Sequence, residues 1–163
     1  MAGYRIREAG PADALALTEA LVEAANWNPD RARPRVAVLS DPIRRQYIAG
    51  WQRPADAGFI AEDELGEPIG AGWYRLFSAD RPGLGFIGTG VPELIVGVRP
   101  VWRAQGVGRS LLQHLVARAA ADGHARLGLS VERGNFAQRL YTSEGFTLLE
   151  NRGSTAVMVR SVA

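Results

Sequence analysis

The sequence contains no cysteine and no lysine, and each absence removes a class of chemistry. Among its 163 residues, all 19 positions that carry lysine or arginine are arginine. Without cysteine there is no disulfide, no thiolate nucleophile and no cysteine-based zinc site. Without lysine, Schiff-base catalysis and the lysine-dependent phosphate loop are excluded. The chemistry of this chain therefore has to use carboxylates, hydroxyls, tyrosine and the backbone.

Long hydrophobic runs and clustered basic charge are also missing. No stretch approaches the roughly 18 apolar residues of a membrane span, and no apolar core follows Met1 as in a signal peptide. The formal net charge is only +2, with arginines interleaved with acids, so no nucleic-acid footprint stands out. The two histidines, His114 and His124, cannot make a three-histidine metal site. We therefore expect a cytoplasmic protein with no membrane, nucleic-acid or metal partner.

The densest basic stretch, Arg31-Ala32-Arg33-Pro34-Arg35, allows two interpretations. Runs of charge usually face solvent, so a solvated loop is the ordinary one. The other is a contact at the rim of a site that receives a phosphate or an acidic substrate.

Length and a hydrophobic content of 47% fit one domain over residues 1–163. Apolar periodicity and turn residues predict strands at 4–7, 58–61, 69–77, 94–98, 127–131, 146–149 and 156–159. They predict helices at about 10–25, 41–51, 109–122 and 135–143, with loops at 27–34 and 78–91. This order predicts an α/β fold with one mixed sheet and helices on both faces, in which 94–98 and 127–131 are parallel.

The turn between strand 94–98 and the following helix carries the strongest sign of chemistry. It includes Gly106 and Gly108 just before the helix, where free backbone N–H groups and the helix dipole favour anionic phosphates. A dinucleotide-binding fingerprint would need a third glycine where Leu111 stands. Paired glycines alone would also fit an ordinary tight turn.

Two motifs make the sequence resemble the GNAT family of N-acetyltransferases. The first is Val98-x-Pro100-x-x-Arg103-x-x-Gly106-x-Gly108. The second runs Asn135-x-Ala137-x-x-Leu140-Tyr141-x-x-x-Gly145-Phe146 and departs from many relatives only at Phe136, where they have proline. The resemblance implies a mostly antiparallel, twisted sheet whose central parallel strand pair is splayed. It also implies acetyl-coenzyme A as the acetyl donor.

The same resemblance implies where the donor binds. The backbone amides of residues 103–108 would hold the pyrophosphate. The backbone of residues 96–98 would pair with the pantetheine arm near Gly97. The implied binding residues are Val96, Gly97, Val98, Arg103, Ala104, Gln105, Gly106, Val107, Gly108, Arg109, Ser110, Asn135 and Tyr141.

The resemblance further implies two catalytic residues and a region that binds the acceptor. Tyr141 would act as a general acid toward the coenzyme A sulfur, although a tyrosine at a helix end also packs as a core aromatic. Glu93 would act as a base, directly or through water, although a glutamate at a strand entry is commonly a solvated charge. Trp27, in the 27–34 loop, would help line the acceptor site.

We therefore expect an N-acetyltransferase that acts on a primary amine of a small molecule, protein or peptide. A catalytically inactive coenzyme A-binding sensor or interaction module remains open, because it needs the 103–108 loop but neither Tyr141 nor Glu93. A nucleotide binder is a weaker alternative, because the lysine partner is missing. A homodimer is possible, since members of the family commonly pair through their C-terminal strands.

Overall fold

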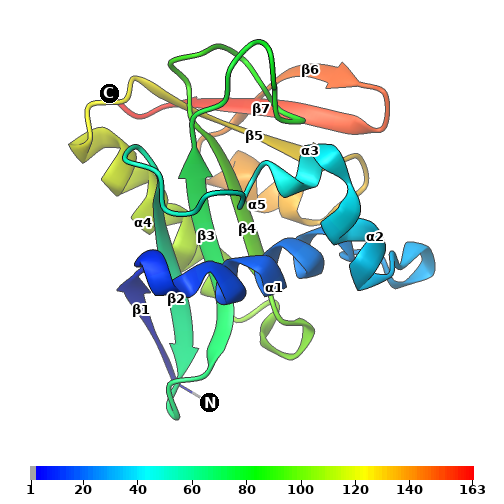
Figure 1. Ribbon diagram of the computed structural model, residues 1–163, viewed down its shortest axis with the longest axis vertical. Helices are drawn as coiled ribbons and strands as arrows, with labels where there is room; N and C mark the ends of the chain where they lie inside the picture. Colours follow the sequence, from blue (N-terminus) through cyan, green and yellow to red (C-terminus); the bar gives the residue numbers. More distant parts are fainter. Residues whose placement is uncertain (1–2) are drawn as a thin grey trace.

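A seven-stranded sheet forms the centre of the computed structural model, which describes residues 3–163 (Figure 1). Its strand order is β1-β2-β3-β4-β5-β7-β6, and every neighbouring pair is antiparallel except β4 and β5. The strands are β1 Tyr4–Glu8, β2 Ala57–Asp63, β3 Pro68–Arg75, β4 Glu93–Val98, β5 Arg126–Glu132, β6 Thr147–Arg152 and β7 Thr155–Ser161. The predicted mixed, mostly antiparallel sheet is confirmed.

The parallel pair at the centre separates almost as soon as it forms. Across β4 and β5 the register contains one pair, Glu93 with Gly128, whereas β5 pairs with β7 along its whole length. The two strands therefore diverge toward their C-terminal ends. This divergence is the splay that the family resemblance implied, and it opens the middle of the sheet.

Helices cover both faces of the sheet (Figure 1). The α1 (Ala14–Ala25), α2 (Arg35–Ser40) and α3 (Pro42–Arg45) helices form one layer, while α4 (Val107–Ala121) and α5 (Ala137–Ser143) lie on the other side. A Cβ added at Gly97 would meet Ala20 of α1, and one added at Gly72 would meet Leu115 of α4. Three short 3-10 turns, Pro11–Asp13, Pro29–Arg31 and Pro100–Trp102, lie in the connections.

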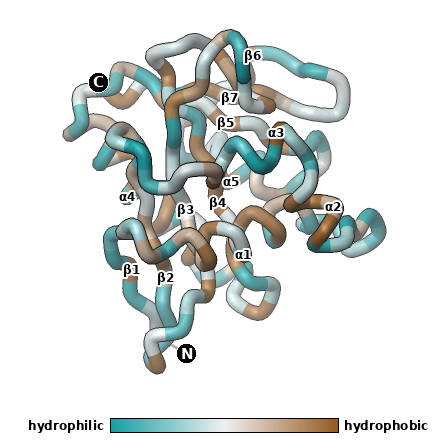
Figure 2. The backbone as a smooth tube through the Cα atoms, viewed as in Figure 1, coloured by the Kyte–Doolittle hydropathy of each residue, from teal (hydrophilic) through white to brown (hydrophobic). Residues whose placement is uncertain are grey.

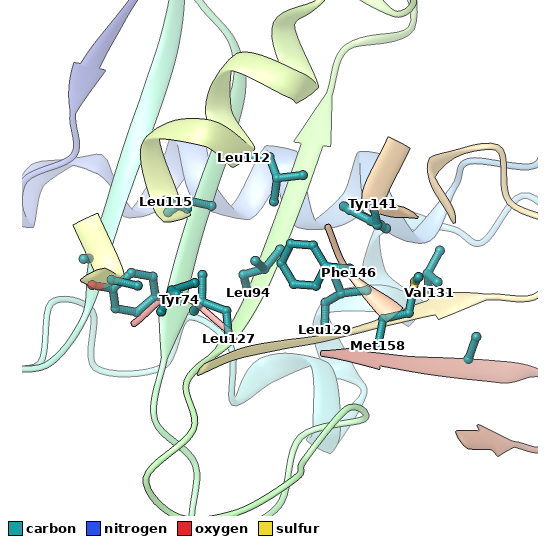
Figure 3. Packing of buried hydrophobic residues seen from close by; sticks show 14 residues of the cluster. Tyr74, Leu94, Leu112, Leu115, Leu127, Leu129, Val131, Tyr141, Phe146 and Met158 are labelled. Carbon is teal, nitrogen blue, oxygen red and sulfur yellow. The ribbon is translucent and has the colours of Figure 1, made fainter. Parts of the chain in front are cut away.

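Each layer buries its own set of apolar side chains. Beneath α1, whose hydrophobic residues stand out in Figure 2, Leu17 and Leu21 cluster with Trp73. Beneath α4 and α5, Leu112 and Leu115 belong to a larger cluster that also contains Tyr141 and Phe146 (Figure 3). Burial of these side chains, at about 25 cal/mol per Å² of apolar surface, holds the helices to the sheet. No helix in residues 3–163 combines the length and apolar content that crossing a bilayer requires.

The predicted single helix over 41–51 is wrong. The structure has α2 at Arg35–Ser40 and α3 at Pro42–Arg45, followed by turns. Asp41 is extended between them, and its Oδ1 accepts hydrogen bonds from the N–H groups of Ile43 (2.9 Å) and Arg44 (3.4 Å). The residue before a proline is pushed out of the helical region, so Pro42 ends one helix and starts the next.

Candidate active site

A cavity of about 880 Å³ lies between the diverging strands β4 and β5. Its other walls come from the end of α1 and the segment after it, from α3, from the loop that starts α4, and from α5. Elements from both faces of the sheet therefore contribute to one site. A volume of this size fits a sizeable ligand.

One end of the cavity lies at the N-terminus of α4. Gly106 caps this helix with a left-handed φ of 85°, and Ala104 has a φ of 60°. A Cβ at Gly108 would lie 3.5 Å from Leu140 on α5, an ordinary van der Waals contact. The guanidiniums of Arg103 and Arg109 also line this end. Free N–H groups, the positive helix end and two arginines together suit a phosphate group.

The predicted site residues divide into those that line the cavity and those that do not. The residues on its wall are Trp27, Val96, Val98, Arg103, Ala104, Gly106, Gly108, Arg109, Asn135 and Tyr141. Absent from its lining are Glu93, Gly97, Gln105, Val107 and Ser110. Val107 is buried beside Leu111 in the core, and Gln105 Nε2 donates to the carbonyl of Val101 (2.9 Å).

Gly97 serves the contact between layers rather than the cavity wall. A side chain there would overlap the backbone of Ala20 in α1. The glycine therefore lets α1 approach β4 closely. Val96 and Val98, its neighbours along the strand, line the cavity instead.

Tyr141 reaches the cavity from α5. Its ring is buried and packs edge-on against Phe146, with ring centroids 6.1 Å apart (Figure 3). Within residues 3–163 its hydroxyl makes no hydrogen bond, so that group remains available to a ligand. Burial raises the pKa of Tyr141 to about 12, which keeps the hydroxyl protonated at neutral pH.

Glu93 is buried, with 2% of its surface exposed, and its link to the cavity is Tyr47. The Tyr47 hydroxyl donates to Glu93 Oε2 and accepts from the N–H of Leu84 (2.9 Å). Burial raises the pKa of Glu93 to about 7 and, with the Glu93 carboxylate, raises the pKa of Tyr47 well above its ordinary value. Tyr47 lines the cavity, so its hydroxyl connects the Glu93 carboxyl, with its pKa of about 7, to the cavity wall.

The other end of the cavity contains charged residues that the sequence did not single out for a role. Glu132, at the end of β5, lies 2.9 Å from Arg33 Nη2 and accepts a hydrogen bond from Trp27 Nε1 (3.2 Å). Arg44 Nη2 lies 4.0 Å from the same carboxylate. Only Arg33 had a signal in the sequence, the 31–35 basic stretch. Tyr47, Arg44 and Glu132 had none, because the folding brings together segments that are distant along the chain.

Comparisons with known proteins agree with this geometry. The model of the acetyltransferase (GNAT) family matches residues 19–146. Mycothiol acetyltransferase of Amycolatopsis mediterranei is 31% identical over 137 residues, covering 83% of this chain and 43% of that protein. The L-methionine sulfoximine/L-methionine sulfone acetyltransferase of Pseudomonas aeruginosa is 40% identical over 78 residues, covering 48% of this chain and 42% of that protein.

Solved structures share the whole fold. The PaiA N-acetyltransferase of Thermoplasma acidophilum, solved in complex with coenzyme A, superposes with a TM-score of 0.71. The superposition covers 98% of this chain and 99% of that one, at 17% identity. The matches to the two curated relatives, in contrast, span less than half of their length. On its family-model match and its sequence relatives, the chain belongs to the GNAT acetyltransferase family.

Proposed function

We propose that this chain transfers the acetyl group of acetyl-coenzyme A to a primary amine of a small molecule. The observation that carries the proposal is the continuous cavity from the N-terminus of α4, between the splayed strands, to the free hydroxyl of Tyr141. Mycothiol and methionine sulfoximine, named for two relatives, are small molecules, and this supports a small acceptor over a protein.

The donor fits the end of the cavity at α4. The loop 103–108 would hold the pyrophosphate with its amides, since Gly106 and Gly108 leave room for a phosphate against the backbone. The exposed backbone of β4 beside Val96 and Val98 would bind the pantetheine arm, because β5 has moved away from it. Acetyl-coenzyme A supplies an activated thioester there.

Three residues would handle protons during the transfer. The Tyr141 hydroxyl would donate a proton to the departing sulfur, which its protonated state allows. The acceptor, as an ammonium, must first lose a proton. Tyr47 would take it while passing its own proton to Glu93, so that Glu93 acts as the base without touching the acceptor.

The test compares acetyl-coenzyme A binding and turnover in Gly106→Val and Gly66→Val. Both glycines have a left-handed φ, 85° and 80°, so both variants carry similar backbone strain, but Gly66 lies in the β2–β3 turn. Acetyl-coenzyme A at 100 times its Kd should stabilise the wild type and Gly66→Val by about 2.7 kcal/mol. Gly106→Val should lose most of that stabilisation, because its side chain would occupy the position of the pyrophosphate.

Thiol release with a panel of primary amines completes the test. Turnover with an amine supports the proposed transferase. Acetyl-coenzyme A binding without turnover of any amine would instead indicate an inactive coenzyme A-binding module. An equal stabilisation of both glycine variants would place the donor elsewhere.

A further inference from the structure

The end of the cavity away from α4 contains two arginines that the donor does not explain. Four arginines and one glutamate line the cavity within the described chain. Arg103 and Arg109 belong to the α4 end. Arg33 and Arg44 come from the layer that contains α1, α2 and α3 and meet at Glu132. This second pair is therefore separate from the end proposed for the donor.

Arg44 retains hydrogen-bond donors that no neighbour within residues 3–163 uses. Its Nη1 donates to Asp41 (2.7 Å), while its Nη2 is 4.0 Å from Glu132 and thus beyond hydrogen-bonding range. A guanidinium has five N–H donors, so most of those on Arg44 remain open. Glu132 is already engaged by Arg33 and Trp27. Arg44 is mostly shielded, with 20% of its side chain exposed, and it lines the cavity.

Both arginines are held in place before any ligand arrives. The side chain of Asn26 bonds the backbone of Arg33 twice, accepting from its N–H (2.5 Å) and donating to its carbonyl (3.1 Å). Arg33 Nη1 also donates to the carbonyl of Ala25 (2.6 Å). Asp41 both caps α3 and pairs with Arg44. Fixed guanidiniums lose little freedom on binding, which favours a specific anion.

We propose that Arg44, supported by Arg33, binds a carboxylate of the acceptor, so that the acceptor is an amino acid or a similar small amine that carries a carboxylate. The inference rests on the proposed acetyl transfer and names its substrate class. A planar guanidinium with open N–H groups holds a carboxylate through two parallel hydrogen bonds. Of the basic stretch 31–35, Arg33 would thus help to bind an acidic substrate.

The experiment compares acceptors that differ only in the carboxylate. The twenty amino acids are assayed with acetyl-coenzyme A beside their carboxamides and, for leucine and phenylalanine, beside the decarboxylated amines. For the preferred amino acid, kcat/KM in the wild type should exceed that of the carboxamide by about 10- to 100-fold. In Arg44→Gln this ratio should fall to about 1.

Arg35→Gln is the matched control. Arg35 lies on α2, pairs with Glu19 at the surface and does not line the cavity, so this variant should keep the wild-type ratio. Stabilisation of Arg44→Gln by acetyl-coenzyme A, equal to that of the wild type, would show that its fold and donor site are intact. A carboxamide or amine that matches the amino acid, or an unchanged ratio in Arg44→Gln, would overturn the inference.

A second measurement does not depend on turnover. With coenzyme A present, an N-acetyl amino acid should raise the Tm of the wild type and not that of Arg44→Gln, whereas the N-acetyl carboxamide should raise neither. No shift with any N-acetyl amino acid would overturn the inference even if amines are acetylated. Failure of the proposed function itself looks different, because no amine, with or without a carboxylate, would then give thiol release.

Discussion

The two ends of the cavity are built in different ways. The end at α4 comes mainly from one loop of consecutive residues, 103–108, whose left-handed Ala104 and Gly106 shape the backbone. The end at Glu132 comes from side chains of three separate segments, with Trp27 and Arg33 before α2, Arg44 on α3 and Glu132 on β5. Backbone therefore dominates where the donor would bind, and side chains dominate where the acceptor would bind.

Tyr141 lines the same cavity, and its removal should have the largest effect. Tyr141→Phe keeps the packing against Phe146 but removes the acidic hydroxyl. We expect kcat and kcat/KM to fall together by about 100-fold, the lower end of the range for a positioned acid, because a thiolate leaves fairly well unaided. Steady-state kinetics with a measured Kd for acetyl-coenzyme A would check this.

Tyr4→Phe is the control for Tyr141→Phe. The Tyr4 hydroxyl donates to the carbonyl of Gly106 (3.3 Å) at the α4 end, so its loss removes a hydroxyl away from the reacting atoms. Its turnover should stay near that of the wild type. Near-normal turnover of Tyr141→Phe would instead leave Tyr141 as a packing residue, and weaker donor binding alone would make it a pantetheine contact.

Replacement of Glu93 should have a smaller effect that depends on pH. Because its pKa is raised to about 7, the carboxylate forms as pH rises through 7, and kcat/KM of the wild type should rise with it. Glu93→Gln should be slower by about tenfold near pH 7.5, less than for a direct base because the proton passes through Tyr47. The loss should shrink toward pH 10, where the amine deprotonates unaided.

Tyr47→Phe should reproduce the same pH profile, since it breaks the same connection.

The stability of the folded protein should change with pH in the direction opposite to activity. The pKa of Glu93 is above its ordinary 4.5, so the folded protein binds this proton more tightly and loses stability as pH rises from about 4.5 through 7. The stability of Glu93→Gln should fall less over that window. Activity profiles of both variants parallel to the wild type would contradict the proton path.

Gln105→Ala should have the smallest effect and sharpens the contrast between the two ends. Gln105 lies within the 103–108 loop, but its side chain bonds Val101 and is absent from the cavity lining. If the backbone of this loop binds the donor, the Kd for acetyl-coenzyme A should change by less than about twofold. A tenfold loss of affinity, measured by calorimetry, would show that side chains matter at this end as well.

The order of the strands and the long helices follow from the sequence because they depend on local periodicity. The apolar run 94–98, the amphipathic pattern of 109–122 and the turn glycines correspond to β4, α4 and the loop between them. The helix predicted over 41–51 starts near α3 but runs too far, because the apolar pattern continues through Tyr47 although α3 ends at Arg45. The α2 helix, which ends just before Asp41, was not predicted.

The loop proposed to bind the donor could be found from the sequence, because consecutive residues 103–108 carry both the glycines and the helix start. The rest of the proposed site depends on how distant segments pack together. Tyr47 and Glu93 are 46 residues apart and Trp27 and Glu132 are 105 apart, so their contacts exist only once the layer containing α1 and α3 packs over the sheet. Burial then raises the pKa of Glu93. The neighbouring sequence does not reveal that this glutamate is buried.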